Sequence, residues 1–376
     1  MTICKIKKIN FYIGKVFLKN FLKITAAIAL VVFFVNVFDA YNQIHGQIQG
    51  YNNSFVKALE ISLVQIPDFI NEMSAILVLM ATIITISSLS YKSEITIIRS
   101  TGFSLWNVIQ PIAFLSFLLG IFWITIFTSL LTYSAKEFNR LEQKYINHEN
   151  RQIIQPKSGI WLKQDNLEHK NQEIIITAKK IYKQNLEFKD VTLWFINNNS
   201  EFYKRIDADE IFLNQNNWLI KSGLVKDDQN LNQRVENITI PTNLVNNLVI
   251  GKIINNFESE KLFSLYKLPN LIKDLKSAGL TTLKFEVYYH NLLSKPLLFI
   301  AMTLIGCYFG LTSTRSKNAI LMIFLGAIFG LLIYMISSIV NTLSASGLIP
   351  IFTATWLLTA LCLAVGILLI YQKELI

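Results

Sequence analysis

The chain has 376 residues, of which 52% are hydrophobic and only 16% are charged, and its mean hydropathy is +0.41. This composition excludes an ordinary soluble protein and indicates a polytopic membrane protein. The net charge of +10 would suit a nucleic-acid partner, but no basic stripe with interleaved stacking aromatics is present, so we expect no nucleic-acid binding.

The first predicted span is the apolar run from Ile24 to Phe38, which follows a lysine-rich flank. A cationic flank ahead of an apolar run stays in the cytoplasm. Because no convincing small-residue cleavage site follows, we expect an uncleaved span rather than a signal peptide. Asp39 lies at the outer end of this span, where a carboxylate either faces water or lines the mouth of a cavity.

Residues 40–67 begin polar and become amphipathic. Phe55, Leu59 and Leu63 recur at every fourth position before Pro67, which predicts a helix that lies on the outer membrane interface. A second span is predicted for residues 69–90, and it returns the chain to the cytoplasm.

The charged stretch at residues 91–107 lies between two apolar runs. Ile95 and Ile98 are spaced i, i+3, and Gly102 is suited to the left-handed position that ends a helix. A short amphipathic helix is therefore predicted at about residues 92–102. Two interpretations are open: a loop whose charges only fix topology, or a docking helix for a soluble motor subunit.

The third span is predicted to run from Trp106, at the interface, to about Leu131. Pro111 is expected to kink it. The helical spacing of apolar residues continues to Tyr145, which predicts a stalk that projects beyond the membrane. Arg140 and Lys144 lie on this stalk.

Alternating hydrophobicity replaces the helical period between residues 158 and 240, and polar Asn- and Asp-rich turns separate the runs. Several strands at this spacing favour a sandwich or jelly roll outside the membrane. The predicted strands are Ile174–Tyr182, Phe188–Ile196, Phe202–Leu213, Asn217–Val225 and Val235–Ile240.

A helix is predicted for residues 262–278, ending at Gly279. Three apolar runs follow at residues 292–311, 319–340 and 349–371, and each is long enough to cross the ~30 Å hydrocarbon core of a bilayer. Arg315, Lys317 and Lys373 flank these runs on one side, so both chain ends are expected in the cytoplasm. Gly326 and Gly330 form a G-x-x-x-G pattern that permits close helix approach.

Motifs that would carry chemistry are absent from the sequence. It has no phosphate-binding loop, zinc-protease signature or nucleophile elbow, and its four histidines are scattered. We therefore expect no catalytic site, no metal site and no cofactor bound by this chain. Arg140, Lys144 and Lys295 are suited either to bind an anionic head group by charge-assisted hydrogen bonds or to snorkel into water.

The order of landmarks along the chain resembles that of the lipopolysaccharide export permeases LptF and LptG of Gram-negative bacteria, and is closer to LptG. The resemblance covers nearly the whole chain. The landmarks are residues 12–14 (Tyr-Ile-Gly), 38–39 (Phe-Asp), 93–94 (Ser-Glu), 100–102 (Ser-Thr-Gly), 159–162 (Gly-Ile-Trp-Leu), 296–297 (Pro-Leu), Tyr334 and 347–350 (Gly-Leu-Ile-Pro).

The resemblance implies a polytopic α-helical membrane protein with six transmembrane helices, three on each side of an inserted, jellyroll-like β domain in the periplasm. The implied domains are residues 1–131, 132–285 and 286–376. The implied location is the inner membrane, with both termini in the cytoplasm.

The resemblance also implies an ABC-type exporter that takes lipopolysaccharide from the inner membrane. The implied partners are a cytoplasmic LptB-like ATPase that uses ATP, a paralogous LptF-like permease, and LptC-like and LptA-like proteins of a periplasmic bridge. The stretch after span two would dock on the ATPase, through Lys92, Glu94, Ile98, Arg99 and Gly102. The candidate lipid contacts are Asp39, Arg140, Lys144 and Lys295.

Two other functions are compatible with the sequence. One is a permease of another ABC lipid or lipoprotein export class, of which the lipoprotein-release type resembles four-span proteins. The other is a membrane-anchored scaffold without transport, which would tolerate changes at Glu94.

Overall fold

The computed structural model describes residues 2–47, 54–145, 153–154, 160–165, 172–182, 187–197, 202–214, 217–227, 233–242, 259–277, 281–313 and 319–375. The chain divides into two compact units. One, the helical unit, comprises Met1–Glu142, Lys261–Leu265 and Leu283–Ile376; the other, the β unit, comprises Gln143–Glu260 and Tyr266–Thr282. Residues 132–142 of the predicted stalk belong to the helical unit.

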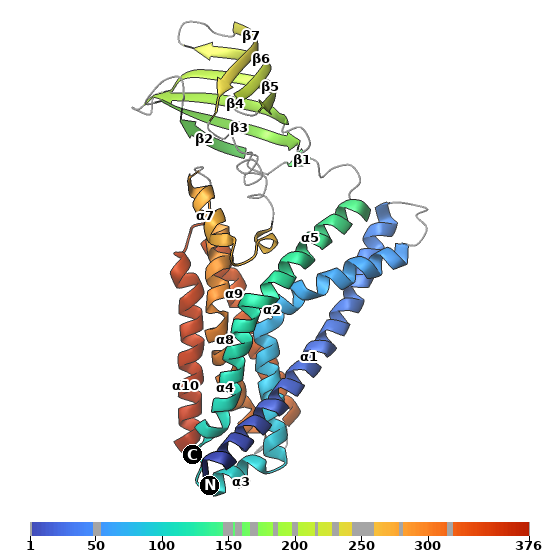
Figure 1. The fold of residues 1–376 in the computed structure, drawn as a ribbon, viewed down its shortest axis with the longest axis vertical. Helices are drawn as coiled ribbons and strands as arrows, with labels where there is room; N and C mark the ends of the chain where they lie inside the picture. The colour runs from blue at the N-terminus through green and yellow to red at the C-terminus, as the bar shows by residue number, and fades with distance from the viewer. Residues whose placement is uncertain are drawn as a thin grey trace. The chain divides into compact units, whose positions relative to one another are not determined.

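Six helices among the described residues are long and apolar enough to cross a membrane. Three precede the β strands and three follow them, so the predicted 3+3 arrangement is confirmed (Figure 1). The helical elements are α1 (Thr2–Gln47), α2 (Ser54–Tyr91), α3 (Glu94–Ser100), α4 (Leu105–Phe122), α5 (Thr128–Tyr145), α8 (Leu283–Ser313), α9 (Ala319–Ala345) and α10 (Leu358–Leu375), with π-helical turns η1 (Trp123–Phe127) and η3 (Thr353–Leu357).

The predicted interfacial helix before Pro67 is not a separate element. It is the first part of α2, which runs without interruption through Pro67 and changes direction along its length (Figure 1). A proline removes one helix hydrogen bond and clashes with the preceding turn, which bends a helix without ending it when tertiary packing holds both halves. Here Ala58 and Ile61 are buried, whereas Phe55 and Leu63 are exposed.

Seven described strands form one antiparallel sheet in the β unit, which confirms the predicted inserted β domain. β3 to β7 pair in chain order. β1 and β2 both pair with the edge of β3 that faces away from β4. The five predicted strands all lie inside observed ones, whereas β1 and β2 were not predicted as strands. The bounds are β1 (Ile153–Ile154), β2 (Ile160–Asp165), β3 (Gln172–Tyr182), β4 (Glu187–Asn197), β5 (Phe202–Asn214), β6 (Asn217–Asp227) and β7 (Gln233–Pro241).

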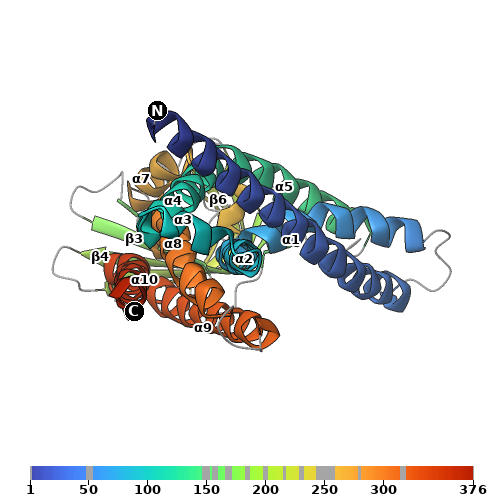
Figure 2. The same cartoon turned by 90° about the horizontal axis from the view of Figure 1, so that it is seen from below.

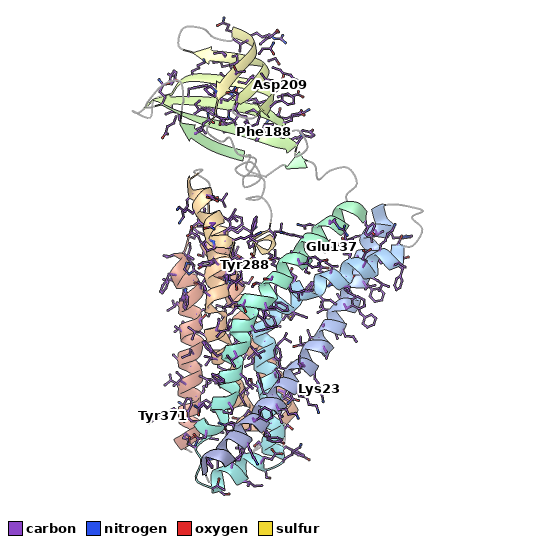
Figure 3. All side chains as sticks on the ribbon, viewed as in Figure 1. Lys23, Glu137, Phe188, Asp209, Tyr288 and Tyr371 are labelled. Atoms are coloured by element: carbon purple, nitrogen blue, oxygen red, sulfur yellow. The ribbon has the colours of Figure 1, made fainter. Side chains whose placement is uncertain are left out.

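One face of the sheet forms the core of the β unit. Val191, Leu193 and Phe195 of β4 are all buried on this face, as their alternation predicts. Phe188 (labelled in Figure 3) packs edge-on against Trp218 on this face, with ring centres 5.1 Å apart. The pairing register shifts between β4 and β5 and between β5 and β6, and such irregularities increase the local twist of a sheet.

The opposite face of the sheet is polar. Thr192 Oγ1 donates to Asp207 Oδ1 over 2.9 Å, and Arg205 Nε donates to the same oxygen over 2.7 Å. Burial by itself would raise the pKa of Asp207, but hydrogen bonds from Arg205, Thr192 and Lys226 outweigh it and lower that pKa. The alternation along β4 therefore separates a packed apolar face from a charged one.

A short helix, α7 (Leu268–Ser277), and a 3-10 turn, η2 (Glu260–Leu262), follow the sheet along the chain. α7 begins six residues later than predicted, and it buries Leu268, Leu271 and Leu275 on one side. The predicted stop at Gly279 lies outside the described residues, as do Arg315 and Lys317.

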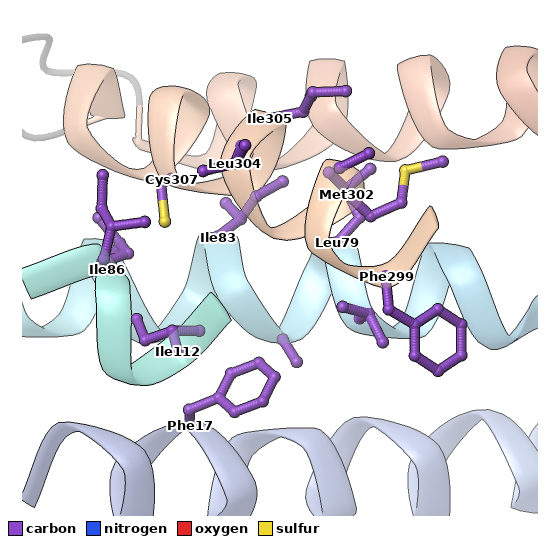
Figure 4. Close-up of a cluster of buried hydrophobic side chains, with 14 of the residues drawn as sticks. Phe17, Leu79, Ile83, Ile86, Ile112, Phe299, Met302, Leu304, Ile305 and Cys307 are labelled. Carbon is purple, nitrogen blue, oxygen red and sulfur yellow. The ribbon is translucent and has the colours of Figure 1, made fainter. Parts of the chain in front are cut away.

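α2 and α8 lie in the middle of the helical unit, with the other long helices around them (Figure 2). The most apolar stretches of α2 and α8 are 56% and 61% buried, compared with 17% for those of α1 and α9. Their shared core draws side chains from all the long spanning helices, including Phe17 of α1, Ile83 of α2, Ile112 of α4 and Phe299 of α8 (Figure 4).

Glycines allow this close packing on α2. A Cβ at Gly326 would lie 2.3 Å from Ile83 Cδ1, and one at Gly330 would lie 2.8 Å from Leu79 Cδ2. The predicted role of the G-x-x-x-G pattern in close helix approach is thus confirmed, and the approach is to α2 of the same chain. A second such pair on α8, Gly306 and Gly310, also faces α2.

Candidate functional site

The charged stretch between α2 and α4 folds into the short helix α3, with a left-handed residue on each side. Ser93 has φ 59° and Gly102 has φ +88°. The Gly102 N–H donates to Arg99 O over 2.9 Å, so the left-handed glycine ends the helix as predicted. The next helix begins at once, because Ser104 Oγ accepts from the Trp106 N–H over 3.1 Å.

α3 has one buried face and one exposed face. Ile95 is 4% exposed and belongs to the core of the helical unit, and Ile98 packs against the same core. Ile97 is 62% exposed and Tyr91, just before the helix, is 88% exposed. The face away from the core is therefore mixed, with Ile97 exposed beside the polar side chains of Thr96, Arg99 and Ser100.

The coupling residues predicted from the sequence lie in α3 and in the turns on either side of it. Lys92 and Arg99 are exposed, and Glu94 is half-buried in the first turn of α3. A carboxylate in the first turn and a cation in the last turn both match the helix dipole. Glu94 also accepts a hydrogen bond from the Tyr12 hydroxyl of α1 over 3.3 Å.

The end of α10 reaches the same end of the helical unit (Figure 1). Glu374 Oε2 accepts from the Leu105 N–H over 3.0 Å, at the start of α4. Hydrogen bonds thus connect the start of α1 to α3 and the end of α10 to the start of α4.

A second polar region lies in the first half of α2, at residues 68–72. Lys261 Nζ is 2.6 Å from Asp68 Oδ1 and 2.8 Å from Glu72 Oε1. Burial by itself would lower the pKa of Lys261, but the two carboxylates outweigh it and raise that pKa above the ordinary lysine value. Lys261 therefore stays charged and fastens the η2 turn to α2.

Lys295 of α8 lies beside this ion pair. Its ammonium donates to the Asn71 side-chain oxygen, and it lies 5.7 Å from the centre of the Trp123 ring. Trp123 Nε1 donates to the same Asn71 oxygen over 3.1 Å. A cavity of about 220 Å³ adjoins these residues, and Glu72, Tyr334 and Thr359 also line it.

The structure does not gather the four predicted lipid contacts. Asp39 is exposed near the far end of α1. Arg140 is held by Glu137 on the exposed side of α5, with Nε and Oε1 3.1 Å apart (Figure 3). Lys144 lies in α5, but its side chain is outside the described part of the chain. Lys295 lies twelve residues inside α8, because that helix begins at Leu283 and not near the predicted residue 292.

Sequence reasoning missed the polar residues of α2. Asp68, Asn71 and Glu72 occupy one helical face at the start of an apolar run, and ionisable groups inside a membrane helix are expensive enough to be a signal. Their partner Lys261 could not be found this way, since it follows almost 190 residues later. Among the described residues no group of His, Cys, Asp or Glu is placed to hold a metal ion.

Comparison with known families gives one match over nearly the whole chain. The family described as lipopolysaccharide export system permease LptF/LptG matches residues 11–372. No curated protein matches the chain.

Proposed function

The chain belongs to the LptF/LptG family of lipopolysaccharide export permeases, and we propose that it is the membrane-spanning subunit of an ATP-driven exporter. In this proposal the subunit takes lipopolysaccharide from the inner membrane and passes it to a periplasmic bridge of β-structured proteins. A multi-pass inner-membrane permease agrees with the six apolar helices. The sequence has no phosphate-binding loop, so a partner subunit must hydrolyse the ATP.

The observation that carries the proposal is the construction of α3. Ile95 anchors the helix in the core shared by the long helices, whereas Ile97 and Tyr91 are left exposed. An exposed apolar tip on a rigid base is suited to dock in a groove of a soluble partner. Since α3 is joined to α2 and α4 by only a few residues, force applied to it reaches both spans.

The proposed partners are an LptB-like ATPase at α3, a paralogous LptF-like permease beside this chain, and LptC-like and LptA-like proteins that continue the path. The chain could equally take the LptF position opposite an LptG-like partner. Both termini and α3 would lie in the cytoplasm, and the β unit would lie in the periplasm. The lysine-rich start of α1 supports this orientation.

The proposed lipid contacts are Asp39, Arg140, Lys144 and Lys295. Asp39 and Arg140 are exposed, so each could meet a head group directly. Lys295 borders the 220 Å³ cavity and donates a hydrogen bond to the Asn71 side chain, and we propose that a phosphate reaches it from that cavity.

Docking is tested with Ile97→Asp, which places a charge on the exposed tip of α3 and leaves the buried Ile95 unchanged. We expect the variant to insert normally but to lose most of the ATPase that co-purifies with the wild-type chain. Leu224→Asp is the matched control, because Leu224 is also an exposed apolar residue, on β6. Normal ATPase recovery with Ile97→Asp would support the scaffold function instead.

The orientation is tested with single cysteines in a cysteine-free chain. Asp209→Cys on the exposed face of β5 should react with a membrane-impermeant thiol reagent in intact spheroplasts, whereas Thr96→Cys on α3 should react only after lysis. Labelling of Thr96→Cys in intact spheroplasts would contradict the proposed topology.

A permease of the lipoprotein-release class is expected to have four spans. The six spanning helices found among the described residues argue against that class.

A further inference from the structure

A large apolar groove lies on the helical unit, away from the polar cavity beside Lys295. Its volume is about 1140 Å³, and α1, α4, α8 and α10 line it. This exceeds the ~300–1,000 Å³ of typical small-molecule sites. Its walls include Phe11, Leu18, Phe114, Phe117, Leu304 and Leu363.

The groove is apolar along most of its length and polar at one end. Its polar lining residues are Asn10, Lys15 and Gln110, which lie near the start of α1 or of α4. Those two helix starts lie at the same end of the unit, because Tyr12 of α1 donates a hydrogen bond to Glu94 of α3, the short helix that precedes α4. Trp106 lines the groove at this end too, and tryptophan favours the boundary between head groups and hydrocarbon.

The length of the groove matches one leaflet of a bilayer. Its lining on α4 extends from Trp106 to Phe117. Eleven residues of α-helix rise by about 17 Å, and one leaflet contributes about 15 Å of hydrocarbon. A molecule with its head at Trp106 and its chains along α4 would thus end near the bilayer midplane.

Lys15 is the charged residue in the lining of the polar end, and the nearby carboxylates of Glu94 and Glu374 accept hydrogen bonds from Tyr12 and from the Leu105 N–H. Among the described residues that line the groove none is acidic. Lys15 is exposed there, and Lys8 and Lys19 are exposed within two turns of it on α1, whereas Lys23 (labelled in Figure 3) lies eight residues beyond Lys15 and outside the groove. In the part of the chain that the structure describes, none of these four lysines forms an ion pair.

A close contact between α1 and α4 forms part of the groove wall. A Cβ at Gly14 would lie 2.6 Å from Leu115 Cδ1, so the Leu115 side chain packs directly on the backbone of α1. Gly14 and Leu115 both line the groove.

We infer that this groove binds an anionic glycerophospholipid from the leaflet at the end of the bundle that carries the chain termini. The acyl chains lie along α4 between α1 and α10, and the phosphate lies beside Lys15. The lipid acts as a fixed part of the structure and is not transported. This site is independent of the proposed export function, since it requires only that the helices span a membrane.

The test uses the full-length chain with a diazirine amino acid at Phe114, which is 61% exposed and lines the groove. The protein is reconstituted in phosphatidylcholine vesicles that contain a minor fraction of phosphatidylglycerol, and the crosslinked lipid is identified by mass. One lysine beside anionic lipid contributes about 1 kcal/mol, so we expect phosphatidylglycerol to be enriched about five-fold over its share of the vesicle.

Three variants make the result specific. Lys15→Gln should reduce the enrichment to the bulk share, whereas Lys23→Gln should leave it unchanged, because Lys23 does not line the groove. A diazirine at Leu331 of α9, which is 50% exposed, should crosslink both lipids in bulk proportion. If the Phe114 position harms folding, the diazirine is moved to Leu18.

Crosslinking of both lipids at Phe114 in bulk proportion would overturn the inference, since it would mean ordinary surrounding lipid. In a second arm, the Phe114 diazirine is activated in cells, where partner proteins and lipopolysaccharide are present; crosslinking there to a partner protein or to lipopolysaccharide would overturn the inference too. None of these results would affect ATPase docking at α3, which the Ile97→Asp experiment tests separately.

Discussion

The carboxylate of Glu374, near the end of α10, accepts a hydrogen bond from the backbone N–H of Leu105, the first residue of α4, over 3.0 Å. The first turn of a helix has N–H groups without partners inside the helix. Ser104 satisfies one of them at Trp106, and Glu374 satisfies that of Leu105. The last predicted span is thereby fastened to the segment that follows α3.

Glu374→Ala should loosen the start of α4. Loss of a capping interaction costs about 0.5–2 kcal/mol, which is a local effect on a protein held by a large core. We expect faster amide hydrogen exchange at residues 102–108, with little change in the middle of α2. Gln372→Ala is the control, since Gln372 is exposed on the same turn. Equal exchange in both variants would show that Glu374 does not hold this segment.

Lys261→Met should lower the thermal stability of the helical unit, because it leaves Asp68 and Glu72 without their cation. All three side chains are partly exposed, so the expected cost is about 1 kcal/mol. Thermal unfolding of the purified chain in detergent gives the difference. Lys267→Met, at an exposed lysine six residues later, is the matched control.

The pH dependence of this loss follows from the raised pKa of Lys261. A group whose pKa is raised on folding stabilises fully at pH values below its unfolded pKa, about 10.4 for lysine, and that contribution disappears as the pH rises through the folded-state pKa. The gap between wild type and Lys261→Met should thus be the same at pH 7 and pH 9. A gap that closes between those pH values would mean that the ion pair is not its cause.

Where local pattern decides the structure, the sequence was sufficient to predict it. In β4 the two faces differ because residues such as Leu193 and Thr192 alternate, so both the strand and its buried side could be read from the pattern. β2 was missed because its six residues include Lys163, Gln164 and Asp165. Gln164 is nevertheless buried, and it accepts hydrogen bonds from Trp218 and Thr242, partners that no local pattern reveals.

Long-range packing decided the features that the sequence did not reveal. Pro67 was expected to separate two helices, but packing of α2 against α1 keeps one helix through it. The sequence also did not reveal that Lys295 lies inside the bundle, beside Asn71 and Trp123. The grouping of Lys261 with Asp68 depends on the return of the chain after the β unit, which periodicity within any one segment cannot predict.

The buried face of β4 gives a test of the proposed transfer of lipid through the β unit. Leu193 is fully buried in the apolar core, so an acyl chain can reach it only when the sheet opens. A photocrosslinking residue at Leu193 should trap lipopolysaccharide only during ATP hydrolysis, if the β unit relays acyl chains. The same residue at Thr192, on the charged face, should not trap it. Equal crosslinking at both positions, or crosslinking without ATP, would contradict the relay.

Glu94 is the residue on which the proposed coupling can be tested most sharply, because the structure shows a second role for it. Within the chain it accepts a hydrogen bond from Tyr12, and in the proposed complex it would meet a cation of the ATPase. Removing one partner of a desolvated, hydrogen-bonded charge pair costs about 2–5 kcal/mol. Glu94→Lys should therefore insert normally but lose ATPase co-purification and lipid-stimulated ATP hydrolysis.

Tyr12→Phe separates the two roles, since it removes only the hydrogen bond inside the chain. A single exposed hydrogen bond contributes about 0.5–1.5 kcal/mol, so this variant should keep most ATPase binding if the charge of Glu94 acts on the partner. Glu94→Gln should fall between wild type and Glu94→Lys, because it keeps the shape of the side chain and loses the charge. If Tyr12→Phe instead reduces coupling as much as Glu94→Lys does, then Glu94 acts by holding α3 on α1. In that case the exposed tip at Ile97 would remain as the docking contact.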